Sequence, residues 1–118
     1  MGHLGVLVFS SPLQRRSATM AAETIEAAVR LGHSVSAFFL ADGVYCTSRA
    51  HLAAPEETVV HRLARLPSSV ALVNCGTCAR FRGLDDTTVL PNARNGSLED
   101  LVDSLGGTDR FLTFGSGP

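Results

Sequence analysis

Residues 70–78 read VALVNCGTC, in which a short apolar run leads directly into two cysteines spaced C-x-x-C. A continuous apolar run of this length is typical of a strand that is buried on both faces of a parallel sheet. Gly76 leaves room beside the first thiol, and residues 77–81 have the character of a short helix that ends at Gly83. We therefore predict that a buried strand delivers Cys75 and Cys78 to a tight turn at a helix start.

The chain on either side repeats this alternation of strand and helix. The other apolar runs predict strands over 4–9, 35–40, 89–90 and 110–114, and helical spacing predicts helices over 17–31, 55–66 and 98–105. Such alternation favours a sheet that is covered by helices on both faces. The predicted fold class is α/β, a single-domain three-layer α/β/α sandwich with a mainly parallel five-stranded sheet.

Length and composition fit one domain over residues 1–118, and residues 115–118 have the composition of a flexible tail. The basic residues number 10, all of them arginine, against 11 acidic residues, and the formal net charge is -1. We expect no direct nucleic-acid partner, because there is no basic excess to attract one. The absence of lysine also excludes Schiff-base and P-loop lysine chemistry.

The cysteines and the apolar runs indicate where the protein works. Three cysteines cannot all pair within one chain, which fits a reducing compartment. No apolar run reaches the roughly 18 to 20 residues that span a bilayer, and residues 1–5 lack the basic start of a signal peptide. We therefore expect a cytoplasmic protein with no membrane partner.

Polar loops follow the first three predicted strands. In parallel sheets, ligands bind beside the loops at the carboxyl ends of the strands, so these loops are predicted to share one rim. The rim is predicted to be lined by Ser10, Ser11, Asp42, Gly43, Cys46, Gly76, Thr77 and Arg80.

The two cysteines of the turn are the candidate reactive groups. A helix N-terminus offers unpaired backbone N–H groups and the positive end of the helix dipole, both of which favour an anionic sulfur. We therefore expect a lowered thiol pKa at this turn, and hence a larger share of the thiolate, which is the nucleophile. Cys46, by contrast, is interpreted first as a partly buried structural thiol and only second as a reactive group of the rim.

Three other interpretations of the C-x-x-C motif stay open. A thiol-disulfide oxidoreductase uses the same spacing, although the motif here follows the third strand and lacks a Trp-Cys-Gly-Pro-Cys surround. A zinc site would need Cys46 and one of His33, His51 or His61 to complete the ligand set. In a non-catalytic small-ligand-binding or scaffold subunit, loss of Cys75 would leave function intact.

Several segments together resemble the DsrE/DsrF-like (TusD-like) sulfur-relay family. They are residues 4–9 with the polar loop that follows, and RLGH (30–33), AFFLADGV (37–44), VNCGTCARFRGL (73–84) and DRFLTF (109–114). The resemblance covers most of the chain, and the cysteine segment is its most specific part.

This resemblance implies a small, commonly oligomeric α/β protein in which one cysteine carries sulfane sulfur as a persulfide. Counting back from Gly83, Cys75 matches that cysteine, whereas relay subunits do not all have a second cysteine at Cys78. The implied partners are sulfur donor and acceptor proteins, with a trimer or hexamer of identical chains as the expected assembly. We expect no cofactor and no metal.

The expected mechanism is thiol exchange. The Cys75 thiolate attacks a donor persulfide, and an acceptor thiolate then removes the outer sulfur. The spacing raises the further hypothesis that Cys78 attacks the Cys75 persulfide, releases hydrosulfide and leaves a disulfide.

Overall fold

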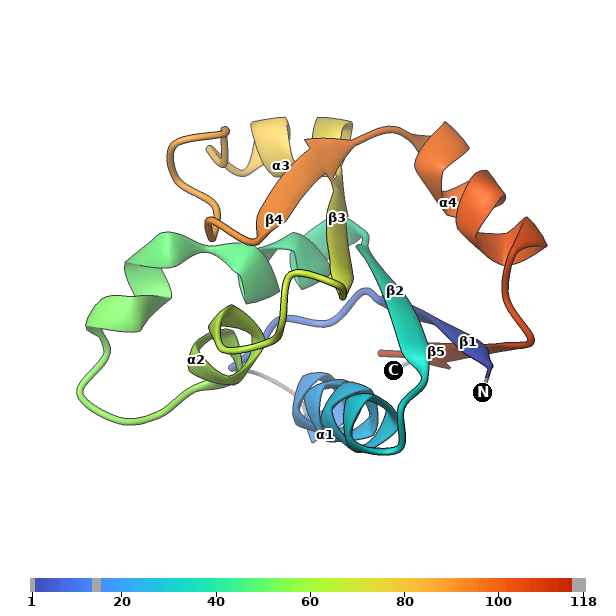
Figure 1. Cartoon of the computed structure of the whole chain (residues 1–118). Helices are drawn as coiled ribbons and strands as arrows, with labels where there is room; N and C mark the ends of the chain where they lie inside the picture. The colour runs from blue at the N-terminus through green and yellow to red at the C-terminus, as the bar shows by residue number, and fades with distance from the viewer. Residues whose placement is uncertain (1, 14–15, 116–118) are drawn as a thin grey trace.

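Parallel strands form the centre of the molecule. The computed structural model describes residues 2–13 and 16–115. Its strands are β1 (His3–Val8), β2 (Ser34–Phe39), β3 (Ala71–Cys75), β4 (Ala93–Gly96) and β5 (Arg110–Phe114). They form a 5-stranded sheet in the order β4-β3-β2-β1-β5, with every pairing parallel (Figure 1). The predicted parallel sheet of an α/β sandwich is confirmed.

Helices connect the strands and cover the sheet. Within the described ranges they are α1 (Arg16–Arg30), the 3-10 helices η1 (Ala41–Thr47) and η2 (Arg49–Ala53), α2 (Val59–Ala64), α3 (Gly76–Phe81) and α4 (Leu98–Gly106). Helices α1 and α2 lie on one side of the sheet, α4 lies on the other, and α3 follows the end of β3 (Figure 1). None of these helices combines the length and the apolar character that crossing a membrane requires.

The main core lies between the sheet and the pair α1 and α2. Val6, Val8 and Phe39 enter it from the strands, and alternate residues of each strand therefore share this face. Helix α1 buries Ala18, Ala21, Ala22, Ile25 and Ala28 against them. Four of these five are alanines, so the helix backbone can approach the sheet closely.

The opposite face of the sheet has a much thinner cover. Phe38, Val73 and Cys75 form a second buried cluster there, and Leu101 of α4 packs against it. No residue of α4 is itself buried. The helix layer on this side is therefore present, as expected, but it shields the sheet only in part.

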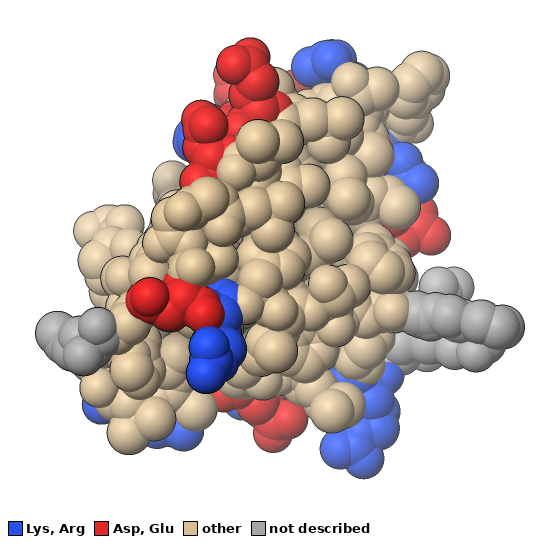
Figure 2. Space-filling view, turned by 90° about the vertical axis from the view of Figure 1, so that its right-hand side faces the viewer, with Lys and Arg blue, Asp and Glu red and all other residues tan. Residues whose placement is uncertain are grey.

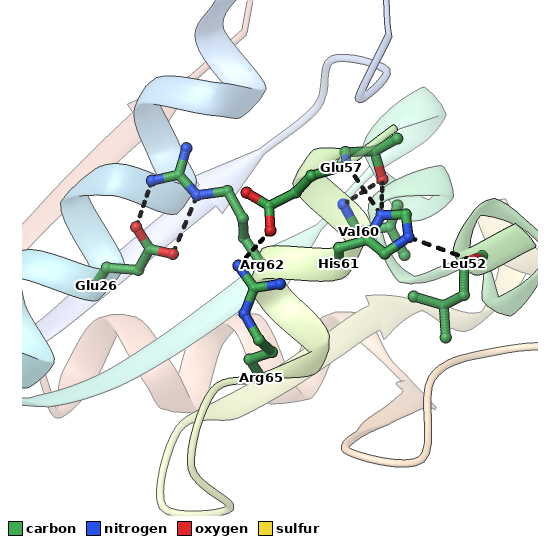
Figure 3. Close-up of polar contacts among 8 residues, drawn as sticks. Glu26, Leu52, Glu57, Val60, His61, Arg62 and Arg65 are labelled. Atoms are coloured by element: carbon green, nitrogen blue, oxygen red, sulfur yellow. Dashed lines mark hydrogen bonds and ion pairs between the residues drawn. The ribbon is translucent and has the colours of Figure 1, made fainter. Parts of the chain in front are cut away.

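Helix α2 is shorter than the predicted helix over 55–66. It begins at Val59, because the Thr58 hydroxyl accepts a hydrogen bond from the Val60 N–H and so acts as the N-cap. The Thr58 N–H in turn donates to His61 Nδ1 at 2.9 Å, which completes a capping box (Figure 3). Residues 55–57 precede this cap, and the prediction that they form the first turn is wrong.

Ion pairs hold α2 in place. Arg62 Nε donates to Glu26 Oε2 of α1 at 3.1 Å, and Arg65 pairs with Glu57 at 2.7 Å (Figure 3). The hydrogen bond from Arg62 lowers the pKa of Glu26, against the smaller opposing effect of burial. The ion pair between Arg62 and Glu26 joins α2 to α1 at a half-buried position.

The prediction of a strand over 89–90 is wrong. Val89 makes only an isolated antiparallel bridge with Ser48, and the fourth strand lies further along the chain at β4. The β4 sequence, Ala-Arg-Asn-Gly, carries almost no apolar signal. It pairs on one side only, with β3, so an edge position explains why a polar sequence forms a strand there.

The segment over 42–46, expected to be a loop, forms η1 and passes very close to β1. A Cβ atom on Gly43 would lie 2.1 Å from the Val8 carbonyl oxygen. The absence of a side chain therefore allows η1 to sit against the end of β1. Gly115 is also packed, against Phe9 and Ser10, whereas the other residues of the expected tail, 116–118, lie outside the described residues.

Gly43→Ala is expected to lower the free energy of unfolding by about 1–3 kcal/mol, because the added methyl group meets backbone that cannot move independently. Gly106→Ala is the matched control, since its Cβ meets nothing within 4 Å and it lies in a helix. The control should leave stability unchanged or raise it by up to about 1 kcal/mol. Urea unfolding followed by circular dichroism measures both; equal midpoints for the two variants would contradict the close approach of η1 to β1.

Candidate functional site

The cysteine turn has the predicted order of strand, turn and helix. Cys75 is the last residue of β3 and the N-cap of α3, with extended backbone angles of φ -63 and ψ 114. Gly76 is the first helical residue. The Cys75 side chain makes no capping hydrogen bond, so it does not occupy the N–H groups of the first helical turn.

Gly76 permits α3 to start where it does. A Cβ atom at this position would lie 2.6 Å from the backbone oxygen of Gly96 at the end of β4, and 3.1 Å from a guanidinium nitrogen of Arg80. The first turn of α3 is therefore packed against the edge strand. Only glycine fits between them without moving the helix.

The two thiols of the turn lie close together but differ in exposure. Cys75 is 6% exposed and belongs to the buried cluster on the thinly covered face. Cys78, at position N3 of the same helix, is half-buried and packs against both hydrophobic clusters. Both are free thiols, and Cys78 packs against the buried cluster that contains Cys75.

The segment after β2 contributes a backbone donor to the site. Ala41 has a φ of 50, the only non-glycine residue with a positive φ in the part of the chain that the structure describes. Its backbone acts on the Cys78 thiol and lowers the pKa of that group. The left-handed conformation costs an alanine about 1–2 kcal/mol, so the surrounding contacts must hold it in place.

Burial is the largest effect on the Cys78 thiol and raises its pKa. The hydrogen bond from Ala41 and the charge of Arg82 act in the opposite direction, and the neighbouring Cys75 raises the pKa further. The net result is a raised pKa, so the expectation of a lowered thiol pKa is wrong for Cys78. Desolvation outweighs the favourable donors here.

Arg82 ties α3 to the loop after β2. Its Nε donates to Asp42 Oδ1 at 2.9 Å, and another guanidinium nitrogen donates to the Cys78 carbonyl oxygen at 3.1 Å. Arg82 was not among the predicted site residues, although its place four residues after Cys78 was a signal in the sequence. The ion pair fixes the segment that carries Ala41 beside the second thiol.

A buried polar network supports the turn from the main-core side. The Asn74 side chain is fully buried, and its Nδ2 donates to Thr47 Oγ1 at 2.8 Å and to Asn95 Oδ1 at 3.0 Å. Thr47 Oγ1 donates onward to the Val44 carbonyl oxygen. This network joins β3, β4 and η1 directly before Cys75. A single polar residue at the end of an apolar run was the available signal.

The remaining predicted rim residues are distributed more widely. Ser10 and Gly43 are buried, Ser11 is half-buried, and Asp42, Thr77 and Arg80 are exposed. Ser10 Oγ is hydrogen-bonded to Ser17 Oγ, and Arg80 donates to Thr77 Oγ1 at 3.3 Å. The structure thus brings Asp42 to the cysteine turn through Arg82, and gives the serines partners within their own loop and α1.

Cys46 lies inside the main core rather than on a surface. Its exposure is 1%, and its thiol contacts the Ser10 carbonyl oxygen at 3.8 Å. Burial raises the pKa of the Cys46 thiol to about 12. Across the described ranges, no three His, Cys, Asp or Glu side chains converge as metal ligands. The ligand set that a zinc site would need is therefore absent from this part of the chain.

The fold and the cysteine turn can be compared with known proteins. The model of the DsrE/DsrF-like family matches residues 3–114, which include every strand and helix described above. The chain belongs to the DsrE/DsrF-like family. This confirms the resemblance seen in the cysteine segment.

Two solved structures share the fold. The YchN protein from E. coli matches with a TM-score of 0.85 and 20% identity, over 97% of this chain and 100% of that chain. MTH1491 from Methanobacterium thermoautotrophicum, a protein of unknown function, matches with a TM-score of 0.65 and 14% identity, over 95% and 99% of the two chains. At these identities the likeness shows the fold alone. The sequence matches no curated protein.

Iodoacetamide is expected to label Cys78 in the native protein and to leave Cys46 unmodified, because a buried, protonated thiol neither meets the reagent nor reacts with it. Peptide mass analysis after labelling at about pH 8 measures this, with protein in concentrated urea as the control in which all thiols react. Labelling of native Cys46 at the rate of Cys78 would contradict its place in the core.

Proposed function

We propose that this protein is a sulfur carrier in which Cys75 holds sulfane sulfur as a persulfide and passes it to the thiol of a partner protein. The observation that carries the proposal is the position of Cys75, at the junction between a buried strand and a helix N-terminus. Membership of the DsrE/DsrF-like family, which is generally linked to sulfur relay, supports it.

The transfer is a pair of thiol exchanges. The Cys75 thiolate attacks the outer sulfur of a donor persulfide; a new sulfur–sulfur bond forms at Cys75, and the donor leaves as a thiolate. An acceptor thiolate then attacks the same outer sulfur, and Cys75 leaves as a thiolate. Sulfur moves with no net oxidation, so neither a cofactor nor a metal takes part.

The helix start is suited to the charged intermediate. A persulfide extends the Cys75 side chain by one sulfur, and its terminal atom carries a negative charge when ionised. The first-turn N–H groups of α3 donate no hydrogen bond to the Cys75 side chain itself. They are donors for the added sulfur, and the helix dipole favours its charge.

Free cysteines also fit the compartment in which such a carrier works. Cys46, Cys75 and Cys78 are all free thiols. Thiols remain free in a reducing compartment, and we therefore place the protein in the cytoplasm, with a sulfur donor protein and an acceptor protein as partners.

A thiol-disulfide oxidoreductase is the second candidate function. The positions of Cys75 and Cys78 favour it, because C-x-x-C thiols at the N-cap and N3 positions of one helix are placed to form a disulfide. The two candidates differ in what they carry: a carrier gains a sulfur, whereas an oxidoreductase loses two hydrogens.

We also expect identical chains to assemble through the side of the sheet that α4 covers. Leu98, Val102 and Leu105 of α4 are 58%, 64% and 46% exposed, and they lie at the spacing of one helix face. Figure 2 views the molecule from the side on which α4 lies, and most of this surface carries no charged side chain. A second copy of the chain would cover this apolar stripe, and a trimer or hexamer is the assembly that we propose.

The carrier is tested by adding glutathione persulfide to the reduced protein and recording intact mass for the wild type, Cys75→Ser, Cys78→Ser and Cys46→Ser. A gain of about 32 mass units that reductant reverses, and that only Cys75→Ser abolishes, is expected. Cys46→Ser is the matched control, since it removes a thiol that is buried in the main core. A loss of about two mass units that requires Cys75 and Cys78, without any gain, would instead establish the oxidoreductase.

Val102→Asp is expected to reduce the mass of the assembly measured by light scattering after gel filtration, because it places a charge on the apolar stripe of α4. Ala53→Asp adds the same charge to an exposed position on η2 and should leave the assembly intact. A wild-type protein that elutes as a monomer would rule out this interface.

A further inference from the structure

The carrier mechanism uses one thiol, yet the structure holds a second thiol in contact with it. Cys75 and Cys78 occupy the N-cap and N3 positions of α3, which a capping box brings together in other helices. Cys78 also packs against the same buried cluster that contains Cys75. The pair therefore has the spacing at which C-x-x-C thiols form a disulfide.

Two features outside the helix act on Cys78. The backbone of Ala41, which adopts an unfavourable positive φ of 50, acts on Cys78 and lowers its pKa. Backbone strain of this kind occurs often at functional sites. Arg82 holds this arrangement, because it binds Asp42 beside Ala41 and the carbonyl oxygen of Cys78 itself.

We propose that Cys78 is a second catalytic thiol, which attacks the persulfide on Cys75 when no acceptor arrives, releases hydrosulfide and closes a Cys75–Cys78 disulfide, with Ala41 and Arg82 as positioning residues. This inference rests on the proposed sulfur carrier. It gives the protein a further activity, the release of hydrosulfide from a persulfide, whose second substrate is a dithiol reductant that reopens the disulfide.

The step balances in atoms and electrons. The Cys78 thiolate attacks the inner sulfur of the persulfide, which is Cys75 Sγ, and the bond between the two cysteine sulfurs forms. The bond from Cys75 Sγ to the outer sulfur breaks, and the outer sulfur leaves with the electron pair as hydrosulfide. The sulfane sulfur is reduced, and the two cysteines are oxidised to the disulfide. The dithiol reductant then supplies two electrons and two protons to restore both thiols.

The environment of Cys78 sets when this step competes with transfer. Burial keeps the pKa of Cys78 above its usual range, so the attacking thiolate is scarce at neutral pH. At neutral pH, transfer of the sulfur to an acceptor is therefore faster than release of hydrosulfide. Release accelerates as the pH rises towards the raised pKa of Cys78. The groups that face Cys78 are Cys75 on α3, the Ala41 N–H and Arg82, whose charge Asp42 partly offsets. Tyr45 of the packed η1 lies near Arg82.

The test begins with protein loaded from glutathione persulfide, freed of the donor by gel filtration, and incubated without any acceptor. Loaded wild type is expected to lose about 34 mass units, the mass of hydrogen sulfide, as free hydrosulfide appears in a bimane assay. Cys78→Ser should keep its added sulfur and release hydrosulfide at least tenfold more slowly. Cys46→Ser is the control and should behave as the wild type.

Arg82→Gln tests the positioning role through the pH profile of release. Loss of the guanidinium charge should move the profile to higher pH and slow release at neutral pH, by about threefold. Arg82→Lys should restore much of the profile, because it keeps the charge. If Arg82→Gln releases hydrosulfide more slowly but its pH profile does not move, the charge of Arg82 does not act on Cys78 as proposed.

The outcomes separate this inference from the function on which it rests. Loaded wild type that keeps its sulfur as long as Cys78→Ser does would overturn the inference and leave the carrier standing. Movement of the added sulfur to a Cys78 peptide, without a disulfide, would overturn it as well, because attack would then occur at the outer sulfur. If no form gains sulfur, the carrier fails and the inference fails with it.

Discussion

The buried amide of Asn74 is the contact on which the cysteine turn depends. Its side-chain hydrogen bonds join β3, β4 and η1 immediately before Cys75. A buried amide that loses its partners costs about 1–3 kcal/mol, so the three segments are held in one arrangement. Gly76 can then pack closely against the backbone of Gly96 in β4, because the network fixes the position of that strand. Cys75 reaches its place at the helix start through backbone that this network has already fixed.

The cysteine turn was predictable from sequence, because its signals are local. An apolar run, two thiols and a glycine lie within nine consecutive residues, and each acts on its immediate neighbours. β4 was misplaced because its strand state comes from pairing with β3 and not from its own side chains. The start of α2 was misplaced because an acidic Pro-Glu-Glu segment imitates a first turn, whereas the hydroxyl of Thr58 supplies the actual cap.

The parts of the site that sequence missed come from distant segments. Nothing in an alanine indicates a left-handed backbone, so the donor at Ala41 became visible only in the structure. Arg82 was visible as a nearby charge, but its partner Asp42 lies 40 residues away, and no spacing rule connects them. The raised pKa of Cys78 has the same origin: both hydrophobic clusters enclose it, and only the fold brings them together.

The pairing of β1 with β5 has a consequence for how the chain is made. Leu4 is paired with Arg110, so the two ends of the chain become neighbours in the sheet. During synthesis β1 emerges before β5, and one side of β1 has no partner until β5 has left the ribosome. An unpaired apolar strand edge is a site of aggregation. Pairing with residues 110–114 thus completes the sheet, and a chain that ended before β5 would keep an exposed strand edge.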